Sequence, residues 1–121
     1  MDFSIPEQTQ QLIDRVRQFV EDEVYPLEAG LQSGSFAELK PQLEEKRDQV
    51  RQLGLWTPQV PESHGGLGLG FLEHALVSEQ LGRSPLGHYV FNAQAPDAGN
   101  MEILIEFGTP EQQQRWLTPL L

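Results

Sequence analysis

Apolar residues recur at three- and four-residue steps between positions 12 and 27, and this spacing constrains the fold more than any other feature. They are Leu12, Ile13, Val16, Phe19, Val20, Val24 and Leu27. Because an α-helix returns to the same face about every 3.6 residues, the pattern predicts a helix of roughly 20 residues with one apolar face. Ser4 followed by Glu7, with Pro6 between them, predicts a capping box at its start. Pro26 predicts its kink or end, since proline has no N–H to donate.

A second helix is predicted from Ser35 to Gly54. Ser35 and Glu38 form a capping-box pattern, and Gly54 stands where a left-handed residue would close the helix. Pro41 falls early, where a missing donor costs least. The predicted inward residues are Leu39, Leu43, Val50 and Leu53. Residues 29–35, AGLQSGS, are predicted to be a loop between the two helices.

Four shorter helices are predicted after a glycine-rich corner, GGLGLG at 65–70. They cover residues 71–81, 84–91, about 99–107 and 110 onward. The start signals are Ser84 with Pro85, and Thr109 and Pro110 with Gln112. The predicted core residues are Phe71, Leu72, Ala75, Leu76 and Leu81 in the first of these helices, and Met101, Leu104, Ile105 and Phe107 in the third. With no strand-like alternation, the sequence predicts an all-α fold, a compact bundle of five or six helices in one domain over residues 1–121.

Charge and composition exclude several classes of function. The net charge of -10, from 18 acidic and 8 basic residues, leaves no basic surface for nucleic acid. No apolar run approaches the roughly 20 residues of a membrane span, and the absence of cysteine excludes disulfides and thiolate sites. The start, MDFSIPEQ, lacks the pattern of a signal peptide, and a cytoplasmic location is expected. The apolar ending, WLTPLL, is expected to be covered by a further part of a longer protein.

Motifs for phosphate, metal or nucleophilic chemistry do not match their templates. The glycine-rich corner departs from the dinucleotide pattern because Phe71 stands at the sixth position counted from Gly66. Its interpretation is instead a turn that uses positive φ and close packing. The histidines, His64, His74 and His88, lack the spacing of metal ligands.

Side chains that resemble catalytic pairs are also expected to be structural. Ser63 and His64 are adjacent, and adjacent side chains are not expected to face each other as a nucleophile and its base. The carboxylates Glu73, Glu79, Glu102 and Glu106 are expected to be solvated. Residues 92–100, NAQAPDAGN, leave two alternatives open. Their small side chains leave room for a ligand, or Asn92 and Asp97 cap the flanking helices.

Three segments in combination carry a family resemblance: GLW…P…HGGLGLG…EHALVSEQLGR, then FNAQAPDAGNMEIL, then FGTPEQQQRWLTPLL. Together they resemble the amino-terminal helical domain of the acyl-CoA dehydrogenases, in the branch whose members carry FNAQAPDxGNME. The resemblance covers nearly the whole chain. Each motif alone is unspecific, and the order of the three makes the resemblance specific.

The resemblance implies part of a larger FAD-dependent enzyme, in which a middle β-domain and a second helical domain follow. Such enzymes remove two hydrogens across the α and β carbons of an acyl-CoA thioester and pass the electrons to an acceptor. The family's catalytic carboxylate and main flavin contacts lie outside this domain. The chain alone is therefore expected to be inactive, with no catalytic, cofactor-binding or metal site, and a homo-oligomer is expected. The alternative is a standalone, non-catalytic interaction module of the same fold.

The resemblance also implies one wall of the acyl-chain pocket. Anchored on Gly108, the matching residues are Phe91, Asn92, Ala95, Pro96 and Gly99, with Asn100 nearby. The small residues at 95 and 99 imply room for a long or bulky acyl chain. Replacement of Ala95 by a large aromatic residue is expected to shift chain-length preference.

Overall fold

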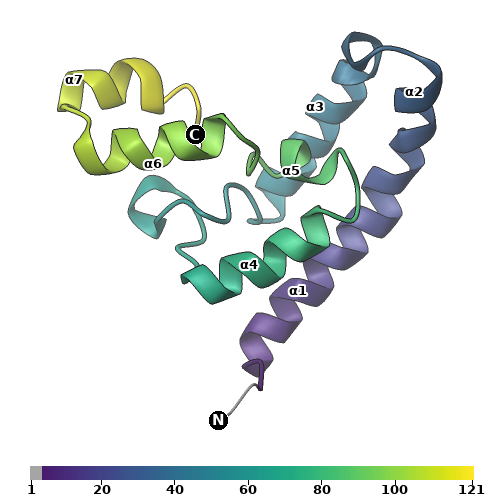
Figure 1. Ribbon diagram of the computed structural model, residues 1–121, viewed down its shortest axis with the longest axis horizontal. Coiled ribbons are helices and arrows are strands. Elements are labelled where there is room, and N and C mark those ends of the chain that lie inside the picture. Colours follow the sequence, from purple (N-terminus) through teal and green to yellow (C-terminus); the bar gives the residue numbers. More distant parts are fainter. Residues whose placement is uncertain (1–3) are drawn as a thin grey trace.

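A computed structural model describes residues 4–121. The first three residues, on which the expectation about a signal peptide partly rests, lie outside the described residues. Over the described part the regular structure is helical, with no strand, and the all-α prediction is confirmed. Figure 1 shows the long α1 lying along α4, while α6 and α7 form a hairpin at the opposite side of the molecule.

The first helical stretch runs further than predicted. Helix α1 (Glu7–Phe19) continues through a π turn (Val20–Val24) and a 3-10 turn (Tyr25–Leu27) into α2 (Glu28–Ser33). The predicted loop at 29–35 is therefore wrong. Pro26 lies in the first turn of the 3-10 segment, where no N–H is required, so the helical path continues to Gly34.

The start of α1 also differs from its prediction. The helix begins at Glu7, so its N-cap is Pro6, and the prediction of Ser4 as the N-cap of a capping box with Glu7 is wrong. Pro6 has φ -54°, which its ring favours just before a helix begins. The predicted apolar face is confirmed, because Ile13, Val16 and Phe19 are buried.

Helix α3 (Phe36–Gln52) begins and ends as predicted. Ser35 Oγ accepts from the Glu38 N–H at 3.3 Å, and the Ser35 N–H donates to Glu38 Oε2 at 3.2 Å, which confirms the capping box. At the other end Gly54 has φ +67°, and the Leu55 N–H donates to the Val50 carbonyl at 3.0 Å. This turn sends Leu55 into the core and leaves Leu53, predicted inward, 49% exposed.

Helix α4 (Phe71–Leu81) has the predicted bounds and a different buried face. Val77 and Leu81 are buried against α1, whereas Phe71 is 92% exposed. Leu72 and Ala75 are exposed as well. The predicted core position Leu81 is confirmed, whereas Phe71, Leu72 and Ala75 were wrong, because the second half of α4 supplies the buried members of the main cluster and the first turn meets α1 through a polar contact of Glu73 with Thr9.

The last helices are short. Helix α5 (Gly87–Val90) is shorter than predicted, because Ser84 Oγ accepts from Leu86 N–H in a turn that precedes the helix. Helix α6 (Asp97–Phe107) begins two residues before the predicted Gly99. The Thr109 capping box is confirmed at the start of α7 (Pro110–Gln112), which passes into a π turn (Gln113–Leu117).

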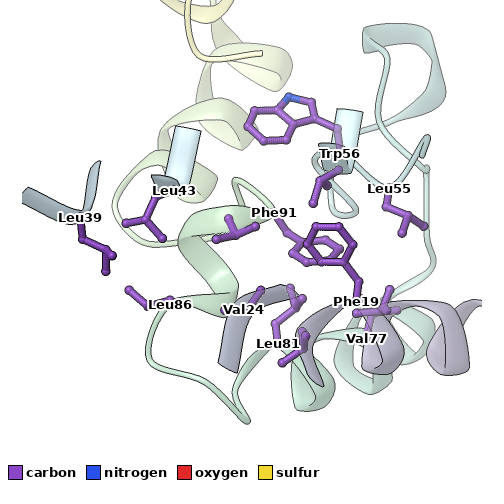
Figure 2. Close-up of a cluster of buried hydrophobic side chains, with 14 residues drawn as sticks. Phe19, Val24, Leu39, Leu43, Leu55, Trp56, Val77, Leu81, Leu86 and Phe91 are labelled. Carbon is purple, nitrogen blue, oxygen red and sulfur yellow. The ribbon is translucent and has the colours of Figure 1, made fainter. Parts of the chain in front are cut away.

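Two apolar clusters hold these elements together. The main cluster joins α1, α3, α4 and α5, and in it Phe19 meets Phe91 edge to face with ring centroids 5.5 Å apart (Figure 2). A smaller cluster of Val60, Met101 and Leu117 joins α6 and the final π turn to the loop after α3. The α6 hairpin therefore has its own small core beside the main one.

Candidate functional site

The α6 hairpin carries an apolar hollow that we name the hairpin hollow. Its volume is about 430 Å³, and its lining residues are Asn100, Ile103, Leu104, Trp116 and Leu120. The first three lie on α6, Trp116 lies in the final π turn, and Leu120 follows it. Ile103 is 60% exposed and Phe107, one turn further along α6, is 74% exposed. An apolar face of this kind on a helical hairpin is typical of a binding or packing surface.

The six residues implied as a pocket wall lie in three different settings. Phe91 and Asn92 are buried, Phe91 within the main cluster. Ala95, Pro96 and Gly99 are exposed. Asn100 is the member of the six that lines the hairpin hollow.

Open space faces part of this segment. A Cβ atom added at Gly99 would meet no heavy atom within 4 Å. The open alternative of helix caps holds for Asn92 and not for Asp97. Asn92, at φ +56°, closes α5, with its own N–H bonded to the Tyr89 carbonyl at 3.1 Å and the next N–H, of Ala93, bonded to the His88 carbonyl at 2.9 Å. Asp97 is the first residue of α6, whose N-cap is Pro96 and has no side-chain cap. The Asn92 amide in addition reaches the last turn of the chain.

Four lining residues of the hollow were missed by the sequence reasoning: Ile103, Leu104, Trp116 and Leu120. A signal for two of them was present, since Asn100, Ile103 and Leu104 lie at helical spacing on one face of α6. Leu104 and its neighbours were assigned to the core because apolar residues usually are. Sequence periodicity does not tell whether an apolar face meets the core or a partner.

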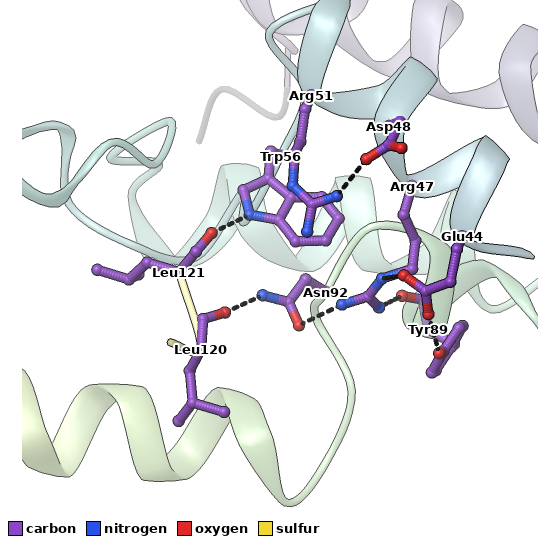
Figure 3. A network of polar contacts seen from close by, with 9 residues as sticks. All are labelled: Glu44, Arg47, Asp48, Arg51, Trp56, Tyr89, Asn92, Leu120 and Leu121. Carbon is purple, nitrogen blue, oxygen red and sulfur yellow. Dashed lines mark hydrogen bonds and ion pairs between the residues drawn. The ribbon is translucent and has the colours of Figure 1, made fainter. Parts of the chain in front are cut away.

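A polar network beside the hollow was not predicted (Figure 3). The guanidinium of Arg47 lies 4.7 Å from the Trp56 ring centroid and 4.6 Å from that of Tyr89. Asn92 Nδ2 donates to the Leu120 carbonyl at 2.7 Å, and Trp56 Nε1 donates to that of Leu121. The two hydrogen bonds join residues 28 and 65 positions apart, so no local sequence pattern predicts them.

One histidine has a perturbed pKa. His88 Nε2 lies 2.8 Å from Ser78 Oγ. Burial, with a smaller contribution from the charge of His74, lowers the pKa of His88 below its ordinary value. A lowered pKa favours the neutral imidazole, whose unprotonated Nε2 accepts a hydrogen bond from the Ser78 hydroxyl. The Ser78–His88 pair joins α4 to α5. Among the described residues, no carboxylate is hydrogen-bonded to the His88 ring.

The adjacent Ser63 and His64 do face each other, contrary to expectation. Ser63 Oγ lies 3.0 Å from His64 Nδ1 at an exposed position. The 3-10 turn of Glu62–His64 brings the two side chains together. Solvent exposure gives this pair no preorganised surroundings for catalysis. In residues 4–121, no group of three or more possible ligands is arranged to hold a metal ion.

The glycine-rich corner uses its own amide groups. The N–H groups of Gly65, Gly66 and Gly68 donate to backbone carbonyls of the preceding turn at 3.0, 3.2 and 2.9 Å. The Gly70 N–H donates to Glu73 Oε2 at 3.0 Å. Because these donors are engaged, the corner does not fit the diphosphate of a flavin nucleotide.

The glycine interpretation is confirmed by backbone geometry. Gly65 and Gly68 have φ of +85° and +60°. A Cβ added at Gly66 would lie 2.0 Å from the Val60 carbonyl oxygen. Within the described chain, no helix combines the length and apolar character of a membrane span.

Comparison with known proteins identifies the family. Residues 6–121 match the model of the acyl-CoA dehydrogenase N-terminal domain. The chain is 40% identical to acyl-CoA dehydrogenase family member 10 of Mus musculus over 119 residues, which cover 91% of this chain and 11% of that protein. It is 32% identical to (R)-benzylsuccinyl-CoA dehydrogenase of Thauera aromatica, and the match covers 97% of this chain and 31% of that protein.

A solved structure agrees with these relatives. A chain from Mycobacterium abscessus that is assigned to the acyl-CoA dehydrogenases superposes with a TM-score of 0.85 at 38% identity, and the match covers 98% of this chain and 32% of that one. This chain thus spans a third or less of the length of these relatives. The extent of the family match and the shared helical fold show that the chain belongs to the acyl-CoA dehydrogenase family, as its N-terminal domain.

Proposed function

We propose that this chain works as the amino-terminal domain of a flavin-dependent acyl-CoA dehydrogenase. In that enzyme it forms one wall of the acyl-chain pocket and packs against the other domains. The observation that carries the proposal is the family match over residues 6–121, joined to an apolar hollow on the α6 hairpin. A cytoplasmic, homo-oligomeric enzyme that passes electrons from an acyl-CoA to an acceptor belongs to the same proposal.

The chemistry of dehydrogenation comes from other parts of such an enzyme. When bound, FAD accepts the hydride removed from the acyl group. The glycine-rich corner does not fit the cofactor's diphosphate, and Glu102 and Glu106 are exposed on α6. The contribution of this chain is then shape, because its apolar side chains exclude water from the acyl chain.

Two measurements test the proposal. The coding sequence downstream of Leu121 is expected to continue into a β-rich segment, and a stop codon there would support a non-catalytic interaction module instead. The full-length protein is expected to be yellow and to oxidise an acyl-CoA with an electron acceptor, while the 121-residue chain is expected to be colourless and inactive. A yellow, active 121-residue chain would contradict the assignment of the chemistry to other domains.

The pocket wall has its own test in the full-length enzyme. Ala95→Trp adds a large ring at an exposed position beside α6 and is expected to shift preference toward shorter acyl chains. The expected change in the long-to-short ratio of kcat/KM is about tenfold or more. Ala29→Trp, at an exposed position on α2, is the matched control. An unchanged preference in Ala95→Trp would remove this segment from the wall.

A further inference from the structure

We propose that Arg47 and Asn92 are positioning residues that set the orientation of the α6 hairpin. Arg47 holds the side chain of Asn92, and the Asn92 amide holds the last turn of the chain against the main body. The inference deepens the proposed function, on which its enzymatic consequence rests. The orientation of the hairpin in the 121-residue chain does not depend on that function.

The Arg47 side chain makes several contacts besides the one with Asn92. Its guanidinium stacks between the rings of Trp56 and Tyr89, at 4.7 and 4.6 Å from their centroids. Its Nη1 donates to the Tyr89 carbonyl, and its Nε lies 3.3 Å from Glu44 Oε2. The side chain is 13% exposed, so these contacts are made largely out of water. A planar guanidinium suits this site because it stacks and donates at the same time.

Asn92 is held in a conformation that residues other than glycine rarely adopt. Its φ is +56°, and its N–H donates to the Tyr89 carbonyl at 3.1 Å. The residue is 2% exposed. The amide can satisfy both neighbours in one orientation, with Nδ2 toward the Leu120 carbonyl at 2.7 Å and Oδ1 toward Arg47 Nη2 at 3.5 Å. The longer contact is the weaker of the two as a hydrogen bond.

A neighbouring turn, at Thr57, is hydrogen-bonded to the segment that contains Asn92. Thr57 also has a positive φ, of +47°, although it is β-branched. Its N–H donates to the Phe91 carbonyl at 3.1 Å, and Gln59 Nε2 donates to that of Asn92 at 3.0 Å. Backbone conformations of this kind cost free energy and persist where surrounding contacts fix them. The turns at Thr57 and Asn92 are therefore linked to each other, and Asn92 is bonded to Leu120. We call this linked region the seam between the α1–α5 part of the molecule, the main body, and the α6 hairpin.

The hairpin depends on this seam because its apolar attachment is small. The second cluster has three buried members, Val60, Met101 and Leu117. Leu120 both accepts the Asn92 hydrogen bond and lines the hairpin hollow (Figure 3). A change at Asn92 thus acts directly on one wall of the hollow.

Hydrogen exchange of the 121-residue chain, followed by NMR, tests the inference. The reporters are the amides of Thr118, Leu120 and Leu121, which are bonded within the last turn. Asn92→Gly keeps the positive φ and removes the amide, while Arg47→Lys keeps the charge and removes the planar fork. Both are expected to lower the protection of these amides by about tenfold, while α1 amides stay within about twofold.

Two matched variants serve as controls. Asn100→Ala removes the amide of an exposed asparagine of the same segment without placing a glycine inside α6, and Arg17→Lys changes an arginine whose partner is Asp14 on the same helix. Both are expected to leave the last turn protected as in the wild type. The Trp56 indole N–H, bonded to the Leu121 carbonyl, gives a second readout. Wild-type protection in both Asn92→Gly and Arg47→Lys would overturn the inference.

The enzymatic consequence is measured separately in the full-length enzyme. Asn92→Gly is expected to raise KM for acyl-CoA by more than it lowers kcat, because the wall shifts while the catalytic groups lie elsewhere. Equal effects on both would count against a positioning role. If the full-length protein oxidises no acyl-CoA at all, the proposed function fails, and the exchange result still decides the role of Arg47 and Asn92 in the chain.

Discussion

The effect of replacing a single glycine in this domain depends on the atoms that surround it. Gly66 is the clearest case, because the Val60 carbonyl oxygen occupies the position where a side chain would begin. Gly99 has the opposite surroundings, with open space where a methyl group would stand. Replacement by alanine is therefore expected to lower the free energy of unfolding at Gly66 and to raise it at Gly99.

Gly66→Ala is expected to destabilise the chain by about 3 kcal/mol, because backbone atoms must move to admit the methyl group. Gly99→Ala, within α6, is expected to stabilise by about 0.5–1 kcal/mol through its effect on the unfolded chain. Urea denaturation of the three proteins measures both changes. Equal destabilisation by the two variants would contradict the local explanation.

His88 gives a prediction about pH. Burial lowers its pKa in the folded chain, whereas the unfolded value stays near the ordinary 6.5. The contribution to stability is thus complete above about pH 6.5 and is lost as pH falls through the lowered value. Urea unfolding at pH 7.5 and 5.5 is expected to show a smaller loss in His88→Gln than in the wild type. A loss in His88→Gln equal to that of the wild type would contradict the prediction.

The sequence predicted some helix ends and some helix faces, and failed at others. The boxes at Ser35 and Thr109 were predicted because each depends on residues three positions apart. The exposed sides of Phe71 and Leu53 were not predicted, since exposure depends on which neighbour a helix meets. Among the site residues, the family resemblance named Asn100, which lines the hairpin hollow, whereas it did not name Arg47, whose hydrogen bonds reach residues 42 and 45 positions away.

The α3 capping box supplies a prediction at this scale. Ser35→Ala removes the side-chain acceptor for the Glu38 N–H and is expected to cost about 1 kcal/mol of folding free energy. Ser33→Ala is the matched control, because its exposed hydroxyl bonds a carbonyl inside α2 and its loss is expected to matter by less than about 0.5 kcal/mol. Thermal denaturation monitored by circular dichroism compares the two. A larger loss in Ser33→Ala would contradict the assignment of the cap.

At the scale of the whole molecule, exposed apolar side chains gather on the α6 hairpin and on the first turn of α4. Ile103, Phe107 and Trp116 mark the first surface, and Phe71 and Leu72 mark the second. The two surfaces lie on separate elements (Figure 1). A partner that covers one need not cover the other.

The isolated chain is expected to self-associate through the hairpin surface. Phe107→Glu is expected to weaken association about tenfold, since it replaces apolar area by a charge. Phe71→Glu on α4 is the control and is expected to leave the association unchanged. Sedimentation velocity over a range of concentrations provides the measurement. A strict monomer at high concentration, or dissociation caused by Phe71→Glu instead, would contradict the prediction.

The division into two apolar clusters has an evolutionary consequence. Free-energy changes add when the altered residues share no contacts, so substitutions on the outer face of α6 are expected to leave the stability of the Phe19–Phe91 cluster nearly unchanged. Selection can then alter the side chains around Ile103 and Trp116 while the main body retains its margin against unfolding. Such a chain can diversify the molecules it accommodates by small, independent steps, provided that the seam between the two clusters is kept.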